Sequence, residues 1–223
     1  MCIRDRDTVE ARQLVRLSEI PLHVQKAFIA TEDHPFYVHK GVRPLAILSA
    51  IKDAVRTGNM RGASTITMQI VRNITEVTGV STERTMQRKI KEAFVALQLE
   101  REFTKDEILE LYLNQIFLGG SANGVESAAQ QYFGKSCKDV TLAEAATLAG
   151  LSRSPNANRP DRYPEAAQQR RDIVLAQMLR HGFITREEYA AAVATNVQDT
   201  AISYEERMRR MQEGTGVWRP NRF

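Results

Sequence analysis

The sequence has very little cysteine: Cys2 and Cys137 are its only two cysteines in 223 residues. Two cysteines this far apart form neither a CxxC pair nor a disulfide framework. The histidines are His23, His34, His39 and His181. They are not paired at the short helical intervals typical of zinc ligands. No metal centre built from these side chains is therefore predicted.

Long apolar runs are also missing. No run approaches the roughly 18 residues that a membrane-spanning helix needs, and no signal peptide is visible. Residues 1–6 begin abruptly, and we interpret them as a non-native scar of cloning or sequence assembly. On that interpretation, a natural N-terminal anchor of the parent protein would have been lost.

Positive charge is only slightly in excess: the chain has 31 lysines and arginines and 27 aspartates and glutamates. The net charge of +4 suits an anionic small substrate or an acidic membrane surface. Basic residues are spread along the chain with few aromatic residues between them, so no platform for stacking bases is visible. A nucleic-acid partner is not expected.

What the sequence does contain is a succession of helix signals. The Thr-x-x-Glu capping pattern begins at Thr104, Thr141 and Thr185, and each copy opens a helical stretch. Residues 86–101 carry apolar side chains at helical spacing, and no segment alternates convincingly with the period of a strand. We predict an all-α protein with one domain over residues 7–206, and a linker or frayed tail over 207–223.

The most informative stretch is Glu32-Asp33-His34-Pro35, which ends the apolar helical run of residues 24–30. Since proline cannot lie in a helix interior, the two acids are expected at a helix end, beside carbonyl groups that disfavour negative charge. This environment would raise the pKa of Glu32 toward working pH. A carboxylate of that kind is useful as a general base.

Two further clusters follow. Ser64 can cap a helix whose polar face carries Thr65, Gln69 and Arg72, and helix N-termini bind anions such as phosphate. Residues 84–92 then place Arg84, Arg88 and Glu92 on one face, next to Lys89. Taken alone, the first cluster is better explained by an ordinary capped amphipathic helix and the second by a solvated charged face than by a binding site.

Read in order, the clusters spell Glu-Asp-x-x-Phe-x-x-His-x-Gly from Glu32, Gly-x-Ser-Thr-Ile-Thr-x-Gln from Gly62, and Arg-Lys-x-x-Glu from Arg88. Residues 105–114 and 170–175 add a fourth and a fifth segment. This order resembles the family 51 glycosyltransferases, the peptidoglycan polymerase domains of class A penicillin-binding proteins and monofunctional transglycosylases. The resemblance covers about residues 18–195. Two departures from the family pattern are Met68, in place of a glutamine, and Arg72, in place of a lysine.

The resemblance implies a lysozyme-like helical domain with a smaller, membrane-facing lobe, and an inverting reaction that polymerises lipid II into β-1,4-linked strands with release of undecaprenyl diphosphate. It implies Glu32, as general base, and Glu92 as the catalytic residues. The residues expected to bind substrate or diphosphate are Ser64, Thr65, Gln69, Arg72, Arg84, Arg88 and Lys89. Supporting residues are Asp33, Phe36, His39, Gly41, Asn114 and Arg171. For Arg170 and Arg171, phosphate binding and packing against the core are both open.

No cofactor is required by the sequence, although a divalent cation, Mg or Mn, could bridge the diphosphate. The implied partners are lipid II, the growing glycan strand, the membrane surface and a cell-wall synthesis complex. The implied location is the outer face of the bacterial cytoplasmic membrane. The apolar stripe Leu45, Ile47, Leu48, Ile51 and Val55 could lie in the membrane interface or in the core.

Two rival functions stay open. A lysozyme-like enzyme that cleaves glycans also uses a glutamate at a helix end, with a second carboxylate across the scissile bond. It has no use, however, for the cations around Glu92. The second rival is an inactive domain that serves as a lipid-binding scaffold, against which the presence of Glu32, Glu92 and the arginines argues.

Overall fold

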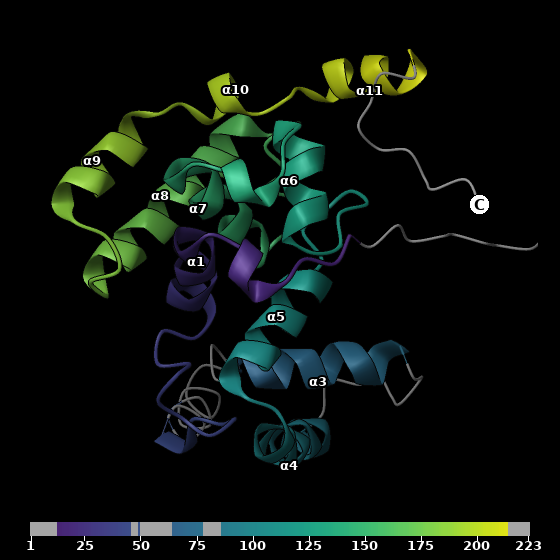
Figure 1. Cartoon of the computed structure of the whole chain (residues 1–223), viewed down its shortest axis with the longest axis vertical. Coiled ribbons are helices and arrows are strands. Elements are labelled where there is room, and N and C mark those ends of the chain that lie inside the picture. The colour runs from purple at the N-terminus through teal and green to yellow at the C-terminus, as the bar shows by residue number, and fades with distance from the viewer. Residues whose placement is uncertain (1–12, 46–48, 50–63, 78–85, 214–223) are drawn as a thin grey trace, which may run out of the picture.

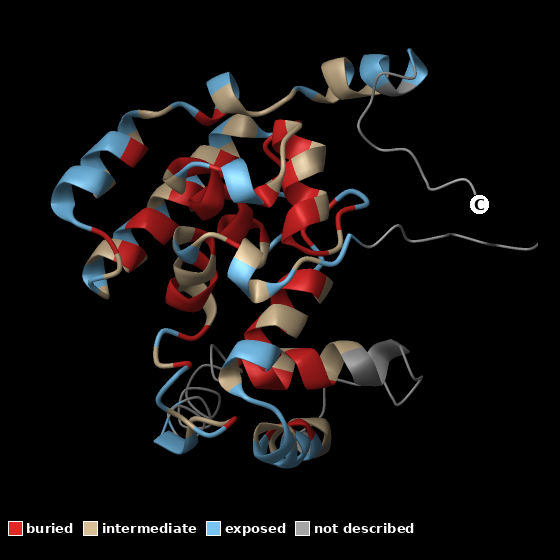
Figure 2. Cartoon of the chain, viewed as in Figure 1, coloured by how far each residue is buried: buried red, intermediate tan, exposed pale blue. Residues whose placement is uncertain are grey.

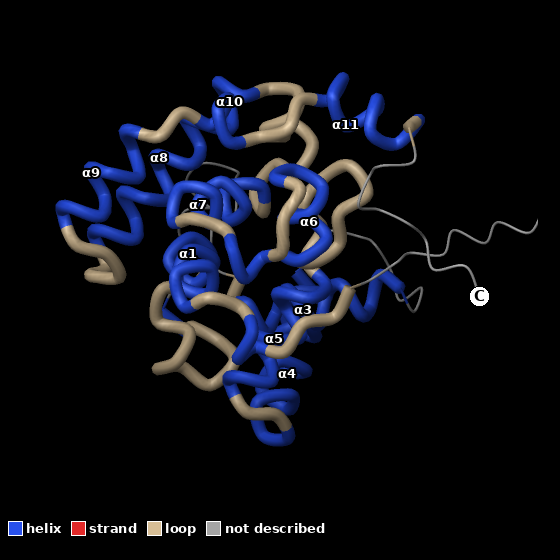
Figure 3. Tube along the Cα trace, turned by 45° about the horizontal axis from the view of Figure 1, so that its top comes forward, coloured by secondary structure: helices blue, strands red, loops and turns tan. Residues whose placement is uncertain are grey.

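The structure, a computed structural model, describes residues 13–45, 49, 64–77 and 86–213 (Figure 1). Within these ranges the chain is helical and has no strand, only the isolated bridges Lys40–Val42 and Phe117–Asn123 (Figure 3). The elements are η1 (Leu17–Glu19), α1 (Leu22–Glu32), α3 (Ile66–Val77), α4 (Met86–Glu102), α5 (Lys105–Gln115), α6 (Val125–Phe133), η2 (Cys137–Asp139), α7 (Leu142–Leu151), α8 (Pro164–Arg180), α9 (Arg186–Ala194), α10 (Val197–Thr200) and α11 (Tyr204–Gln212). The predicted all-α fold is confirmed.

Helix α7 forms the centre of the larger body. Every residue from Ala143 to Leu151 is buried, because alanine, leucine and glycine cover the whole circumference of the helix. Its small side chains allow α1 and α8 to pack closely against it. Figure 2 shows the buried residues concentrated in this body, and the C-terminal end of α1 emerges from it.

A smaller lobe contains α3 and α4, which pack against each other, and α5 connects the lobe to the larger body (Figure 1). Met68, Val71 and Ala96 form a separate apolar cluster between α3 and α4. The expectation of a smaller lobe is therefore confirmed. Its orientation toward a membrane remains a prediction.

The three capping boxes are confirmed. Thr104, Thr141 and Thr185 each accept a hydrogen bond from the backbone amide three residues later, and the glutamate at that position bonds back to the threonine amide. Each box satisfies two amides that the helix leaves unpaired, so each fixes the start of its helix. These are the starts of α5, α7 and α9.

The expected frayed tail from Arg207 does not hold for residues 207–212, which continue α11. The helix is anchored to the body: Arg207 pairs with the buried Asp161 at 3.0 Å, and the Tyr204 amide donates to the Asp161 carbonyl. Arg162 also stacks 3.9 Å from the centre of the Tyr204 ring. A run of charged residues is typical of a solvated tail, but here Arg207 has a partner in the folded body. Residues 1–6 and 214–223 lie outside the described part.

Candidate active site

Glu32 is the last residue of α1, as the sequence predicts, and its carboxylate has two polar partners from distant segments. Gln69 on α3 donates through Nε2 to Glu32 Oε2 at 2.8 Å. The Ser152 hydroxyl, at the end of α7, lies 2.5 Å from Glu32 Oε1. The carboxylate is thus fixed between the smaller lobe and the larger body.

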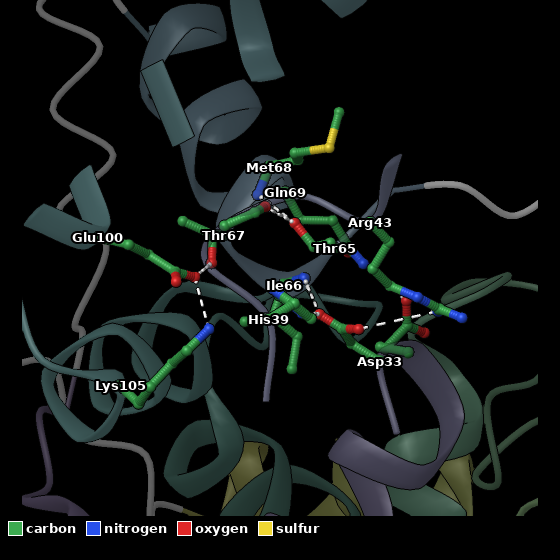
Figure 4. A network of polar contacts seen from close by, with 12 residues as sticks. Asp33, His39, Arg43, Thr65, Ile66, Thr67, Met68, Gln69, Glu100 and Lys105 are labelled. Carbon is green, nitrogen blue, oxygen red and sulfur yellow. Dashed lines mark hydrogen bonds and ion pairs between the residues drawn. The ribbon is translucent and has the colours of Figure 1, made fainter. Parts of the chain in front are cut away.

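Asp33 ends α1 as its C-cap, and its buried side chain faces the smaller lobe (Figure 4). Its Oδ2 lies 2.7 Å from His39 Nε2 and accepts the Ile66 amide at 3.2 Å, while Arg43 lies 3.9 Å from Oδ1. Ile66 is the first residue of α3, so a carboxylate sits at that helix N-terminus, where negative charge is stabilising. Asp33 therefore positions the loop and α3 around Glu32.

The structure corrects the cap predicted for α3. Thr65, not Ser64, is the capping residue: its hydroxyl oxygen accepts the Met68 amide at 3.1 Å and its proton goes to the Gly41 carbonyl at 2.6 Å. With the Ile66 amide already bound to Asp33, the start of α3 offers less to a phosphate than the sequence suggests. Ser64 is instead free to face the cations described next.

Glu92 on α4 is buried, with 2% of its side chain exposed, and three cations surround it. Arg88 lies 3.1 Å from Glu92 Oε1, Arg72 lies 3.6 Å from the same oxygen, and Lys89 lies 3.6 Å from Oε2. One carboxylate thus organises three positive charges. We call Arg72, Arg88, Lys89 and Glu92 the cationic cluster.

Ser64 joins this cluster. Its hydroxyl oxygen accepts from Lys89 Nζ at 2.5 Å and from Arg72 at 3.3 Å. Burial lowers the pKa of Lys89; Glu92 opposes that effect, while Arg72 and Arg88 add to it. A bound anion would relieve the repulsion among the cations, so the cluster is suited to a diphosphate.

A network of polar contacts links the predicted segments to one another (Figure 4). Glu100 on α4 accepts from the Thr67 hydroxyl at 2.5 Å and from Lys105 Nζ at 2.7 Å. The same ammonium group lies 4.4 Å from the centre of the buried Phe36 ring. Phe36, a supporting residue in the prediction, thus helps to join the loop after α1 to α4 and α5.

Three other supporting residues act through the backbone. Gly41 has a φ of 81°, and a Cβ there would lie 2.7 Å from the Ala96 carbonyl oxygen, so only glycine lets this loop approach α4. Asn114 is held by the backbone of Val15 and Glu110. Arg171 is fully buried and bonds Asp172 and the carbonyls of Val193 and Thr195. For Arg171 the structure decides in favour of packing over phosphate binding.

Of the two departures from the family pattern, Met68 is buried in the apolar cluster with Val71 and Ala96. Arg72 belongs to the cationic cluster, as expected from its charge. Arg84 lies outside the described residues, as do Ile47, Leu48, Ile51 and Val55. Leu45 is exposed.

Three residues lie near Glu32: Ser152, which sequence reasoning missed, and Tyr112 and Arg170, which lie in the predicted segments but were not placed beside Glu32. Ser152 comes from a polar loop that carries no motif, and the Tyr112 phenol and Arg170 approach from α5 and α8. Burial raises the pKa of Tyr112 well above its usual value, and the charges of Glu32 and Asp33 add to the increase. Burial and then Arg153 lower the pKa of Arg170, while Glu32 opposes them. No sequence signal distinguishes Ser152, since its partner is 120 positions away.

Comparison with known proteins decides the family. A model described as Transglycosylase matches residues 2–179. This chain belongs to the transglycosylase family. Among its relatives, Penicillin-binding protein 1A of Aquifex aeolicus is 48% identical over 186 residues, which cover 83% of this chain and 25% of the relative. Penicillin-binding protein 1A of Escherichia coli is 49% identical over 176 residues, covering 78% of this chain and 20% of the relative.

A similar protein is also found among solved structures. The crystal structure of Penicillin-binding protein 1A from Haemophilus influenzae matches with a TM-score of 0.50 and 27% identity, over 91% of this chain and 20% of that one. The chain thus spans a quarter or less of the length of these relatives. The cationic cluster and Glu32 both lie within the residues that match the family.

Across the described residues, no group of three or more histidine, cysteine, aspartate or glutamate side chains could hold a metal ion. In the same part of the chain, no helix is long and apolar enough to cross a membrane.

Proposed function

We propose that this transglycosylase domain is a peptidoglycan glycosyltransferase, which polymerises lipid II into β-1,4-linked glycan strands and releases undecaprenyl diphosphate. The observation that carries the proposal is the pairing of one anchored carboxylate, Glu32, with a separate cationic cluster. A transfer from a sugar diphosphate needs both parts: a base for the attacking hydroxyl and positive charge for the leaving group.

In the proposed reaction, Glu32 takes the proton from the 4-hydroxyl of the acceptor sugar. The hydroxyl oxygen forms a bond to the anomeric carbon of the growing chain, and the bond from that carbon to the diphosphate breaks. A single displacement inverts the anomeric centre, from an α-linked diphosphate to a β-linked strand. The negative charge that develops on the diphosphate is met by Arg72, Arg88 and Lys89.

Glu92 is proposed to hold these three cations in place and not to exchange a proton with the sugar. Its burial and its short contact with Arg88 support this role. If a divalent cation, Mg or Mn, takes part, the diphosphate itself would supply oxygen ligands to it. None of the steps above depends on it.

We place the domain at the outer face of the cytoplasmic membrane, where its lipid substrate would be. Helix α4 supports this, because Ile90 is 65% exposed and Phe94 is 61% exposed. Exposed apolar side chains of this size, close to the cations of the same helix, suit a surface that meets lipid headgroups. Association with a cell-wall synthesis complex remains a proposal without a structural argument.

The glycan-cleaving alternative is weaker on the same geometry. A cleaving enzyme uses a second carboxylate near the scissile bond, but Glu92 is occupied by three cations. An inactive scaffold is also disfavoured, since it would have no need for two polar partners that fix the Glu32 carboxylate.

The test is polymerisation of labelled lipid II in detergent by the chain and by Glu32→Gln. We expect glycan strands from the parent. In the variant the rate of polymerisation should fall by about 10³-fold, which is the typical contribution of a general base. Glu102→Gln, an exposed acid at the end of α4, is the matched control and should retain activity. Shortening of preformed glycan without any polymerisation would instead establish the cleaving enzyme.

A further inference from the structure

Ser152 is placed at the contact between the end of α7 and the end of α1. Its hydroxyl oxygen lies 2.5 Å from Glu32 Oε1 and 2.8 Å from the carbonyl oxygen of Ala149, one helical turn back. The residue is partly buried and has the backbone conformation of the last helical turn, so the hydroxyl is held in position by α7. It therefore contacts one oxygen of the proposed base, while Gln69 contacts the other.

A hydroxyl group has one proton to donate, yet both neighbours of Ser152 are oxygen acceptors. While Glu32 is ionised, the proton points to the carboxylate, because hydrogen bonds to a charged acceptor are the stronger ones. When Glu32 is protonated, the carboxylic acid itself can donate to Ser152 Oγ. The hydroxyl proton then turns to the Ala149 carbonyl, and both hydrogen bonds are kept.

We infer that Ser152 is a positioning residue for the general base, holding Glu32 in one place in both of its protonation states. The inference rests on the proposed function, and it adds a residue from a loop that no sequence motif marks. Gln69 cannot do the same, because the Nε2 group that faces Glu32 Oε2 only donates.

During the proposed transfer, the proton that leaves the acceptor hydroxyl ends on Glu32 Oε1, and no other group gains or loses one. Ser152 changes from donor to acceptor toward Glu32 as its own proton rotates to Ala149. When Glu32 later gives its proton to water, the hydroxyl turns back. The base is thus reset without losing its orientation between successive additions to a strand.

Three other groups act on Glu32 from the neighbouring elements: Asp33 next to it, the Tyr112 phenol on α5 and the Arg170 guanidinium on α8. Replacing Ser152 leaves all three in place and removes only the hydrogen bond.

The test compares Ser152→Ala, Ser152→Thr and the matched control Ser154→Ala, which removes an exposed hydroxyl two residues further on. Rates of lipid II polymerisation are measured together with KM and the melting temperature. For Ser152→Ala we expect kcat to fall by about 10- to 100-fold with KM little changed, as for other hydrogen bonds to charged groups. Ser152→Thr, which keeps the hydroxyl, should recover most of the rate, and Ser154→Ala should match the parent.

The inference is overturned if Ser152→Ala keeps the parent's rate, or if Ser152→Thr is as impaired as Ser152→Ala at an unchanged melting temperature. Glu32→Gln, run in parallel, separates this failure from failure of the proposed function. Strands from the parent and a strong loss in Glu32→Gln leave the proposed function standing whatever Ser152 does. A parent that makes no strands refutes the proposed function itself.

Discussion

Glu92 shows how a single buried residue can organise a binding site for an anion. Its one negative charge is shared among Arg72, Arg88 and Lys89, so the cluster keeps an excess of positive charge. An isolated buried carboxylate would be costly, and so would three crowded cations without it. The arrangement is consistent with a site completed by a negatively charged substrate group.

Arg72 offers a direct test of this arrangement. Arg72→Gln should lower kcat/KM for lipid II by about 100-fold, because positive charge aimed at a leaving group acts mainly in the transition state. Arg72→Lys, which keeps the charge but not the fork of donors, should stay within about fivefold of the parent. Steady-state kinetics on the three proteins decide the matter. Equal loss in both variants would mean that the shape of arginine, and not its charge, is required.

At the scale of elements, Glu126 joins α6 to η2. Its carboxylate accepts from the Cys137 amide at 2.7 Å, from Ser136 at 3.1 Å and from Gln130 at 3.0 Å. Burial acts to raise the pKa of Glu126, but these hydrogen bonds outweigh it and the pKa is lowered from 4.5. A carboxyl group whose pKa is lower in the folded state stabilises the fold at pH values above its unfolded-state pKa. That contribution is lost as the pH falls through the folded-state pKa.

Glu126→Gln should therefore cost about 1–3 kcal/mol of unfolding free energy at pH 7, since an amide cannot accept from all three donors. The difference from the parent should shrink as the pH is lowered below 4.5, where the native carboxylate also becomes protonated. Urea unfolding at several pH values measures this directly. A gap that stays constant with pH would show that the charge of Glu126 is not what stabilises the contact.

An element can be predicted from the sequence when the residues that define it are close together in the chain. The capping boxes at Thr104, Thr141 and Thr185 are local signals, and all three mark true helix starts. The cap of α3 was misassigned to Ser64 because the choice of Thr65 depends on a bond to the distant Gly41 carbonyl. Ser152 was missed altogether for the same reason: its partner becomes visible only when α1 and α7 are packed together.

At the scale of the whole molecule, exposed apolar side chains are distributed unevenly over the described part of the chain. The larger body buries α7 from Ala143 to Leu151, whereas α4 in the smaller lobe leaves Ile90, Phe94, Val95 and Leu97 exposed (Figure 2). The sequence pattern of residues 86–101 predicted the helix but could not show that this face lacks cover from the described part of the chain. We interpret it as the face toward the membrane.

Substituting Ile90 and Phe94 together with serine should leave the melting temperature within a few degrees, because exposed side chains contribute little to the core. Binding to vesicles that contain anionic lipid should fall by about tenfold or more, through the loss of buried apolar area. Co-sedimentation with vesicles tests this, with Ile173→Ser, an exposed apolar residue on α8, as the control. Unchanged binding would place the membrane contact elsewhere.

The central claim is that the domain joins sugars by displacing a diphosphate with Glu32 as the base. Its most direct test is to measure, in one reaction, the amount of undecaprenyl diphosphate released and the number of glycan linkages formed by the parent and by Glu32→Gln. The account predicts equal amounts of the two products from the parent and about 10³-fold less of both from the variant. The account would be contradicted if the parent released diphosphate without forming new linkages. It would also be contradicted if Glu32→Gln formed as many linkages as the parent.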